Sequence, residues 1–123
     1  MSGNKFLLDT NAVLYILNGD KTLADFLFEK ELYLSIISEM ELLSYKDLTD
    51  KDRKEIMEFL KAFIIININE NIKLNTIEVK KTSSMKLPDS IIAATAISLK
   101  LPLITSDRHF KNVKHLNLVY YEK

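Results

Sequence analysis

Short apolar segments alternate along this chain with longer amphipathic segments. The apolar segments lie at 5–8, 32–37, 64–68, 102–105 and 116–121, and their aliphatic, β-branched and aromatic residues predict five strands. Between them, apolar residues recur at helical spacing, which predicts helices over 11–17, 22–30, 38–46, 50–63, 70–81 and 88–101. Strands separated by helices pair in parallel, and the crossovers cover both faces of the sheet. The sequence therefore predicts an α/β fold.

The composition favours one ordinary globular domain over residues 1–123. The chain is 47% apolar and 28% charged, with only two Gly and two Pro, so no linker divides it. No apolar stretch approaches the roughly 18 residues of a membrane span, and no secretory signal is visible. The absence of cysteine excludes disulfides, thiolate metal sites and thiol catalysis. A cytoplasmic protein without a membrane partner is the expectation.

Charge is unevenly distributed although the net charge is zero. From Val79 onward, eight Lys or Arg residues face three acidic residues, which gives +5 there and −5 in the rest of the chain. This asymmetry permits a local phosphate-binding surface in the C-terminal part. Taken alone, the asymmetry favours an ordinary solvated basic face.

Acidic residues follow three of the predicted strands. Asp9 comes directly after the first strand, Glu41 follows the second, and Asp107 follows the fourth. Asp89 opens the long apolar helix that runs up to the fourth strand. In an open α/β sheet, ligands bind in the crevice beyond the carboxyl ends of the strands. These acids are therefore candidates for one common site.

Each acid also has a purely structural explanation. Asp9 can cap the helix that follows it, and Asp107 can cap a helical turn. Glu41 stands three residues after Ser38, in the spacing of a capping box. Asp89 follows Pro88, the usual opening of a helix. From spacing alone, both interpretations remain open.

The sequence segments around these acids resemble one protein family. The segments "LLDTNAVLYIL", "LSIISEMELL" and "LPDSIIAATAISLKLPLITSDRHF" are similar, in order and spacing, to a PIN domain, most of all to VapC-type toxins of prokaryotic toxin–antitoxin pairs. The resemblance implies a three-layer α/β/α sandwich with a parallel sheet of about five strands in the order 3-2-1-4-5. It also implies a metal-dependent endoribonuclease with an RNA substrate, a small cognate antitoxin and a homodimeric state.

The resemblance assigns roles to particular residues. The family's four catalytic acids match Asp9, Glu41, Asp89 and Asp107, and its supporting polar positions match Asn11 and Ser106. Four crowded carboxylates repel one another unless a cation neutralises them or some take up protons. Oxygen ligands without cysteine suit Mg²⁺, with Mn²⁺ as an alternative. We expect Asp9, Asp89 and Asp107 to hold that metal, which would activate water for attack on the phosphodiester.

Several neighbouring residues are candidates for supporting roles. Arg108 and Lys86 stand beside predicted ligands and are possible phosphate contacts. His109 stands where relatives often carry a further acid, and Glu39 is expected to be solvated. The apolar residues of the two N-terminal helices can form core or a groove for an antitoxin helix: Leu14, Leu17, Leu23, Phe26 and Leu27.

Two other functions compete with a nuclease. A haloacid-dehalogenase phosphotransferase also places an Asp after the first strand, but it needs a second Asp where this chain has Asn11. A PIN-like domain could instead have lost catalysis and bind only RNA or a protein partner. The presence of all four acids argues against this second alternative.

Overall fold

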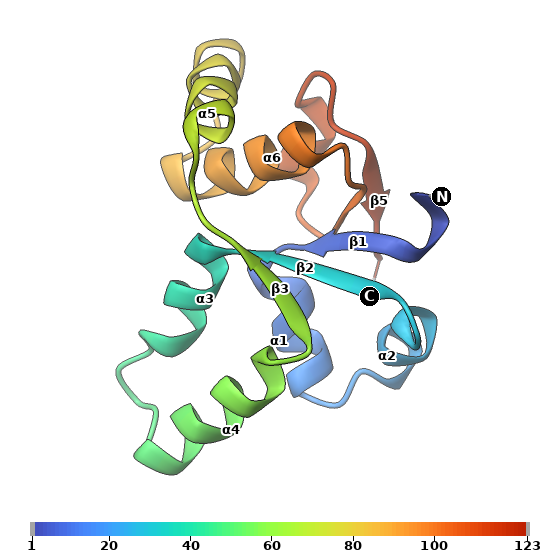
Figure 1. The fold of residues 1–123 in the computed structure, drawn as a ribbon, viewed down its shortest axis with the longest axis vertical. Helices are drawn as coiled ribbons and strands as arrows, with labels where there is room; N and C mark the ends of the chain where they lie inside the picture. Colours follow the sequence, from blue (N-terminus) through green and yellow to red (C-terminus); the bar gives the residue numbers. More distant parts are fainter. Residues whose placement is uncertain (1, 123) are drawn as a thin grey trace.

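The computed structural model describes residues 2–122 and places one parallel sheet between two layers of helices (Figure 1). The strands are β1 (Lys5–Leu8), β2 (Glu31–Ser35), β3 (Phe63–Ile66), β4 (Leu103–Thr105) and β5 (Leu118–Tyr120). They form a five-stranded sheet in the order β3-β2-β1-β4-β5, and every neighbouring pair is parallel. The predicted α/β class, layering and strand order are confirmed.

The crossovers are helical. They contain α1 (Thr10–Leu17), α2 (Lys21–Leu27), α3 (Ile36–Leu43), α4 (Asp50–Leu60), α5 (Glu70–Thr82) and α6 (Leu87–Leu99), with short 3-10 turns η1 (Ser2–Asn4) and η2 (Arg108–Asn112). Among residues 2–122, no helix has both the length and the apolar character needed to cross a membrane.

Alternation along β1 supplies both faces of the sheet with core residues. Phe6 and Leu8 join the cluster under α1, α2 and α4, whereas Leu7 joins the cluster beneath α5 and α6. All three side chains are buried. Such a strand, buried on both faces, reads as a continuous apolar run, which explains the pattern "FLL".

The strand register brings the carboxyl ends of β1, β2 and β4 together. Leu8, the last residue of β1, pairs with Leu34 on one side and Ile104 on the other. The chain order also reverses at β1, since β2 and β4 flank it on opposite sides. In open α/β sheets, this reversal point is where ligands bind.

The boundary between β2 and α3 differs from the prediction. The strand expected over 32–37 ends at Ser35, and α3 begins at Ile36. Ser35 is the N-cap, with its side chain accepting from the Ile37 N–H at 3.1 Å. The structural interpretation of Ser38 and Glu41 as a capping box is therefore wrong, and Glu41 lies in the second turn of α3.

Other helices end earlier than expected. The helix predicted over 50–63 ends at Leu60, and the one predicted over 88–101 ends at Leu99. Lys100 follows in the left-handed conformation, with φ 55° and ψ 42°, which stops α6. Pro88 is the second residue of α6 rather than the first.

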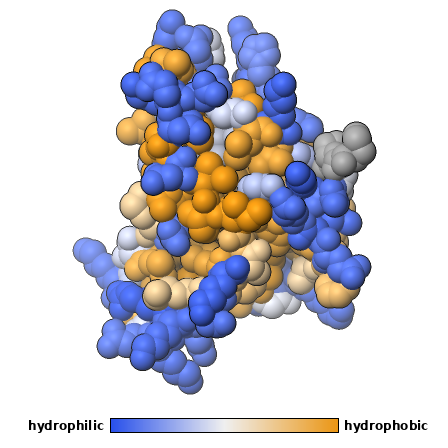
Figure 2. All heavy atoms as spheres, in the orientation of Figure 1, coloured by the Kyte–Doolittle hydropathy of each residue, from blue (hydrophilic) through white to orange (hydrophobic). Residues whose placement is uncertain are grey.

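One face of the molecule carries exposed apolar surface. Figure 2 shows hydrophobic side chains gathered in the middle of this face, with charged side chains above and below. Large apolar residues exposed on α3, β3 and α5 include Met40, Ile64, Leu74 and Ile77. Exposed apolar residues that gather on one face can mark an interaction surface.

Candidate functional site

Asp9 is the buried centre of the candidate site. Its side chain is 4% exposed, and Oδ1 accepts a hydrogen bond from the Ala12 N–H at 2.8 Å, which caps α1. Burial raises the pKa of Asp9 to about 6; hydrogen bonds from Thr105 and Ala12 oppose this rise, and the carboxylates of Asp107 and Asp89 add to it. Asp9 thus caps a helix and lies among other acids.

Thr105 connects two of these acids. Its fully buried hydroxyl donates to Asp9 Oδ2 and accepts from the Asp107 N–H at 2.9 Å. Asp107 in turn caps η2, because its Oδ1 accepts from the His109 N–H at 2.9 Å. The His109 ring lies against the same oxygen, with Nδ1 at 2.9 Å. One hydroxyl therefore ties the end of β1 to the loop after β4.

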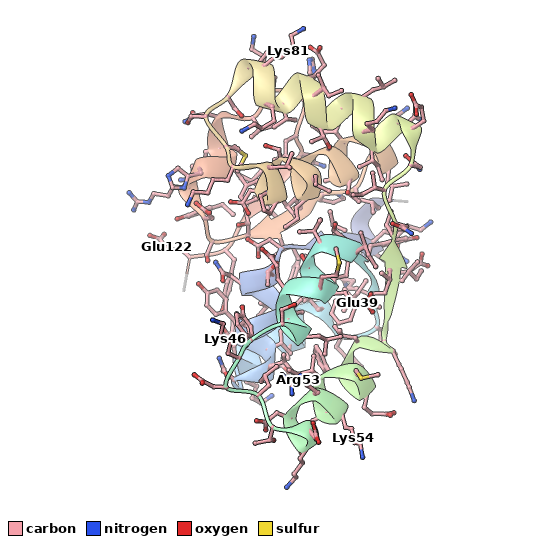
Figure 3. The ribbon with its side chains drawn as sticks, turned by 90° about the vertical axis from the view of Figure 1, so that its left-hand side faces the viewer. Glu39, Lys46, Arg53, Lys54, Lys81 and Glu122 are labelled. Atoms are coloured by element: carbon pink, nitrogen blue, oxygen red, sulfur yellow. The ribbon has the colours of Figure 1, made fainter. Side chains whose placement is uncertain are left out.

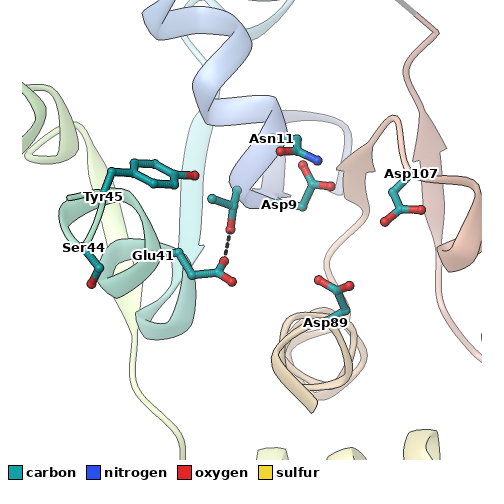
Figure 4. A pocket seen from close by; sticks show the side chains of 8 residues that line it. Asp9, Asn11, Glu41, Ser44, Tyr45, Asp89 and Asp107 are labelled. Carbon is teal, nitrogen blue, oxygen red and sulfur yellow. Dashed lines mark hydrogen bonds between the residues drawn. The ribbon is translucent and has the colours of Figure 1, made fainter. Parts of the chain in front are cut away.

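Glu41 reaches the site from α3. The Thr10 hydroxyl, at the start of α1, donates to Glu41 Oε1 at 2.6 Å (Figure 4). The hydroxyls of Thr10 and Ser38 lie 2.9 Å apart, so Ser38 also supports this contact from α3. Because α3 begins at Ile36, Ser38 and Glu41 lie one turn apart on the same side of the helix.

Asp89 enters from the first turn of α6. Burial raises its pKa, and the carboxylates of Asp107 and Glu41 raise it further, while His109 and Lys86 lower it. Repulsion from Asp89 and Asp107 acts on Asp9 as well. The four acids are therefore close enough to perturb one another.

These acids share a cavity of about 390 Å³. Figure 4 shows the carboxylates of Asp9, Glu41, Asp89 and Asp107 around a common space. The remaining residues that line this cavity are Thr10, Asn11, Ser44 and Tyr45. None of these lining residues, within the described 2–122, is a lysine or an arginine. The cavity therefore has an uncompensated negative charge once its acids ionise.

The donor set fits a hard divalent cation. All the candidate ligands are carboxylate oxygens, and burial together with repulsion from neighbouring carboxylates raises the pKa of both Asp9 and Asp89. Across residues 2–122, no group of three or more acidic or histidine side chains is already arranged to hold a metal ion. Mg²⁺ accepts such an open arrangement, because it keeps several waters and uses only one or two carboxylates plus substrate oxygens.

The other predicted residues divide into two groups. Asn11 lines the acidic cavity, and Lys86 lines an adjoining cavity beside Asp89. The Ser106 hydroxyl instead lies 2.7 Å from the Tyr15 hydroxyl. The guanidinium of Arg108 lies beside the Tyr120 hydroxyl and Glu122, and these neighbours raise its pKa. Ser106 and Arg108 line neither cavity.

Sequence reasoning missed Thr10, Thr105 and Tyr45. Thr10 directly follows Asp9, and Thr105 stands two residues before Asp107. The short sequences "DT" and "TSD" were therefore the available signal. Their hydroxyls join residues 31 and 96 positions apart, which spacing cannot reveal. Tyr45 had no signal, because its place in the cavity depends on the path of the loop between α3 and α4.

Comparison with known proteins matches residues 6–116 to the PIN domain. This chain belongs to the PIN domain family. A search of curated proteins returned no match. Similar solved PIN structures include a toxin–antitoxin complex from Klebsiella pneumoniae, with 28% identity and a TM-score of 0.82, covering 95% of this chain and 98% of that one.

Two further structures agree with this chain over nearly its full length. VapBC2 from Rickettsia felis, bound to a DNA fragment from its promoter, is 20% identical, with a TM-score of 0.85 and coverage of 96% and 99%. VapBC-1 from nontypeable Haemophilus influenzae is 22% identical, with a TM-score of 0.85 and coverage of 94% and 97%. At these identities the likeness shows the PIN fold.

Proposed function

We propose that this PIN domain is a Mg²⁺- or Mn²⁺-dependent endoribonuclease that hydrolyses RNA phosphodiester bonds in the cytoplasm as the toxin of a toxin–antitoxin pair. The observation that carries the proposal is the convergence of four carboxylates from β1, α3, α6 and the loop after β4 on one cavity. Membership of the PIN family supports the same chemistry.

Each acid has a proposed task. Asp9, Asp89 and Asp107 hold the metal, and Glu41, fixed by Thr10, orients the attacking water. The chemistry supplied by bound Mg²⁺ is charge neutralisation at the scissile phosphate and a lower pKa for the attacking water. The buried hydrogen bonds to Asp9 hold its carboxylate in place before the substrate arrives.

The polar neighbours support the substrate. Asn11 faces the cavity and can donate to a phosphate oxygen, and Lys86 can neutralise a phosphate next to the scissile one. Ser106 fixes the loop that carries Asp107 through its contact with Tyr15. Arg108 contacts the RNA backbone outside the cavity.

The proposed protein partner is a small antitoxin. Similar structures were solved as toxin–antitoxin complexes. A groove of about 270 Å³ between α1 and α4 includes Leu14, Leu17, Leu48 and Ile56 among its lining residues, which suits an apolar helix. Leu23 and Leu27 are core residues instead. Replacing Leu17 with Glu should weaken capture of the antitoxin without unfolding the chain.

We also propose a homodimer. The exposed apolar residues of α3, β3 and α5 give a second copy a surface to cover, among them Leu74 at 52% exposed. Light scattering on the purified chain should give twice the 14.2 kDa mass of the monomer.

Cleavage of a mixed pool of structured RNAs tests the nuclease proposal. We expect cutting with Mg²⁺ or Mn²⁺ that is lost in EDTA and in Asp89→Asn. Glu39→Gln, in the first turn of α3 (Figure 3) and outside both cavities beside the acids, is the matched control and should cut like the wild type. No cutting by folded, metal-loaded protein would favour the alternative of a PIN domain that only binds RNA or a partner.

A further inference from the structure

Two cavities meet at the acid cluster. Beside the acidic cavity lies a second one of about 300 Å³, lined by Ser84, Met85, Lys86, Asp89, Asp107 and His109. Asp89 and Asp107 line both cavities. The acids thus lie in the middle of a cleft with two arms, one reaching Tyr45 and the other reaching Lys86.

Tyr45 gives the first arm an apolar wall. Among the described residues that line the acidic cavity, it alone has an aromatic ring, and it is 43% exposed. Figure 4 shows this ring reaching from the end of α3 toward α1, alongside Glu41. A half-exposed aromatic face in an otherwise polar cavity suits a flat ligand such as a nucleobase.

Arg53 fixes the loop that carries Tyr45. Its guanidinium donates to the Leu48 carbonyl at 2.9 Å and to the Tyr45 carbonyl at 3.4 Å. The Leu48 N–H also donates to the Tyr45 carbonyl, at 3.3 Å. Because the backbone is tethered in this way, the ring is presented at little cost in conformational entropy.

The second arm carries a lysine. Lys86 lines it together with His109, and both side chains act electrostatically on Asp89. An ammonium group in the cavity next to the acids can pair with a backbone phosphate beside the scissile one. An enzyme that cuts inside a strand must hold the strand on both sides of the scissile bond, and the two arms offer complementary means of doing so.

We propose that Tyr45 and Lys86 bind one RNA strand on opposite sides of the scissile phosphate, Tyr45 by stacking on a base and Lys86 by pairing with a phosphate. The inference rests on the proposed function for the place of that phosphate. Stacking on Tyr45 requires a base whose face is free, and duplex pairing keeps both faces covered. The substrate segment is therefore single-stranded.

Binding measured against salt separates the two contributions. The probe is a fluorescent single-stranded RNA, titrated into Asp89→Asn protein with Mg²⁺ at several KCl concentrations. Tyr45→Ala and Tyr45→Leu should weaken binding about 5- to 100-fold at every salt concentration, whereas Tyr45→Phe should bind normally. Lys86→Gln should reduce the slope of log affinity against log salt by about 0.7.

Matched surface substitutions provide the controls. Phe28→Ala removes an aromatic ring that is 72% exposed just after α2. Lys54→Gln removes a cation from α4, at the end of the molecule away from α5 and its Lys81 (Figure 3). Both should leave affinity and salt slope unchanged. Thermal melts followed by circular dichroism confirm that each variant is folded.

Three binding results would overturn the inference: unchanged affinity in both Tyr45→Ala and Tyr45→Leu, an unchanged salt slope in Lys86→Gln, or tighter binding of a duplex than of either of its strands. Cleavage by protein with Asp89 intact is scored separately. Cutting that does not depend on Tyr45 overturns this inference and leaves the nuclease proposal standing. Tyr45-dependent binding without any cutting contradicts the nuclease proposal and leaves the binding roles of Tyr45 and Lys86 standing.

Discussion

Asp9 combines two tasks that a single carboxylate can perform at once. One oxygen accepts from the Ala12 N–H and starts α1, and the other accepts from the Thr105 hydroxyl. Because both oxygens are held, the carboxylate cannot turn away from Asp89 and Asp107. Burial raises the pKa of Asp9, because its charge is neither solvated nor paired with a cation, and the two hydrogen bonds only partly oppose this rise.

The pKa of Asp9 predicts a pH dependence of stability in metal-free protein. It rises from 3.8 to about 6 on folding, so the folded state binds more protons between these values and stability falls as pH rises through them. Asp89 acts in the same direction, and His109 and Lys86 are the cations beside it. For Asp9 alone, unfolding free energy should fall by about 1 to 2 kcal/mol from pH 5 to 7.5.

Urea unfolding in EDTA at the two pH values measures this effect. Asp9→Asn should remove most of the decline and be more stable than the wild type at pH 7.5. Asp25→Asn, an exposed acid on α2, controls for the loss of a charge. Equal pH dependence in wild type and Asp9→Asn would show that Asp9 ionises normally.

Thr105 offers a second test at the scale of one hydroxyl. Thr105→Val keeps the shape of the buried side chain but removes the bonds to Asp9 and to the Asp107 N–H. The unfolding free energy should fall by about 1 to 3 kcal/mol, and divalent cations should bind more weakly because the two acids lose their link. Thr105→Ser keeps the hydroxyl and should retain metal affinity, which calorimetric titration with Mn²⁺ measures. Equal affinities in the two variants would contradict the role of the hydroxyl.

Among the elements, α6 has the most to do with the site, because its first turn carries Asp89 while residues from Ser90 to Ala96 are buried. Its end is strained. Lys100 adopts a left-handed conformation that costs a residue with a Cβ atom roughly 1 kcal/mol. Lys100→Gly should therefore raise the unfolding free energy by about 0.5 to 1 kcal/mol, as seen by urea unfolding. Lys100→Ala keeps the Cβ and should change little, so equal stability of the two variants would contradict the argument.

Element types were predictable because each apolar run or helical period is a local signal. The boundaries of the elements were harder to predict, as the junction of β2 and α3 shows. Ile36 and Ile37 are β-branched and favour a strand, yet they begin a helix because Ser35 caps it and because β2 pairs with β3 only as far as Ser35. Tertiary pairing overrode propensity there. The helix thus begins two residues earlier than predicted, and Ser38 and Glu41 face Thr10 from the same side of it.

At the scale of the whole molecule, the resemblance to PIN domains predicted the strand order and singled out the four acids. Secondary-structure propensities alone give neither the order of strands in a sheet nor a reason to prefer these acids over others. The helix that bears Asp89 shows what periodicity cannot predict. Its apolar spacing gives the length of the helix but not which of its ends faces the edge of the sheet. The two-armed cleft was not predictable either, because Tyr45 and Lys86 are 41 positions apart and meet the acids only through the packing of α3 and α6.

Metal, protons and folding should be linked across the molecule. A ligand that binds only folded protein adds RT ln(1 + [L]/Kd) to stability, about 2.7 kcal/mol when its concentration is 100 times Kd. Protons compete for the same carboxylates, and the pKa of Asp9 near 6 leaves it mostly protonated at pH 5. Saturating Mn²⁺ should therefore raise the melting temperature by several degrees at pH 7.5 and by much less at pH 5.

Differential scanning fluorimetry at the two pH values, with Mn²⁺ or Mg²⁺ against EDTA, measures this linkage. Asp9→Asn and Asp89→Asn should lose most of the stabilisation at pH 7.5, whereas Glu39→Gln should keep it. Equal stabilisation of wild type and both Asn variants would place the bound metal elsewhere on the surface. A stabilisation that does not weaken at pH 5 would mean that the metal does not displace a proton from Asp9, so the raised pKa and the metal site would be separate features of the chain.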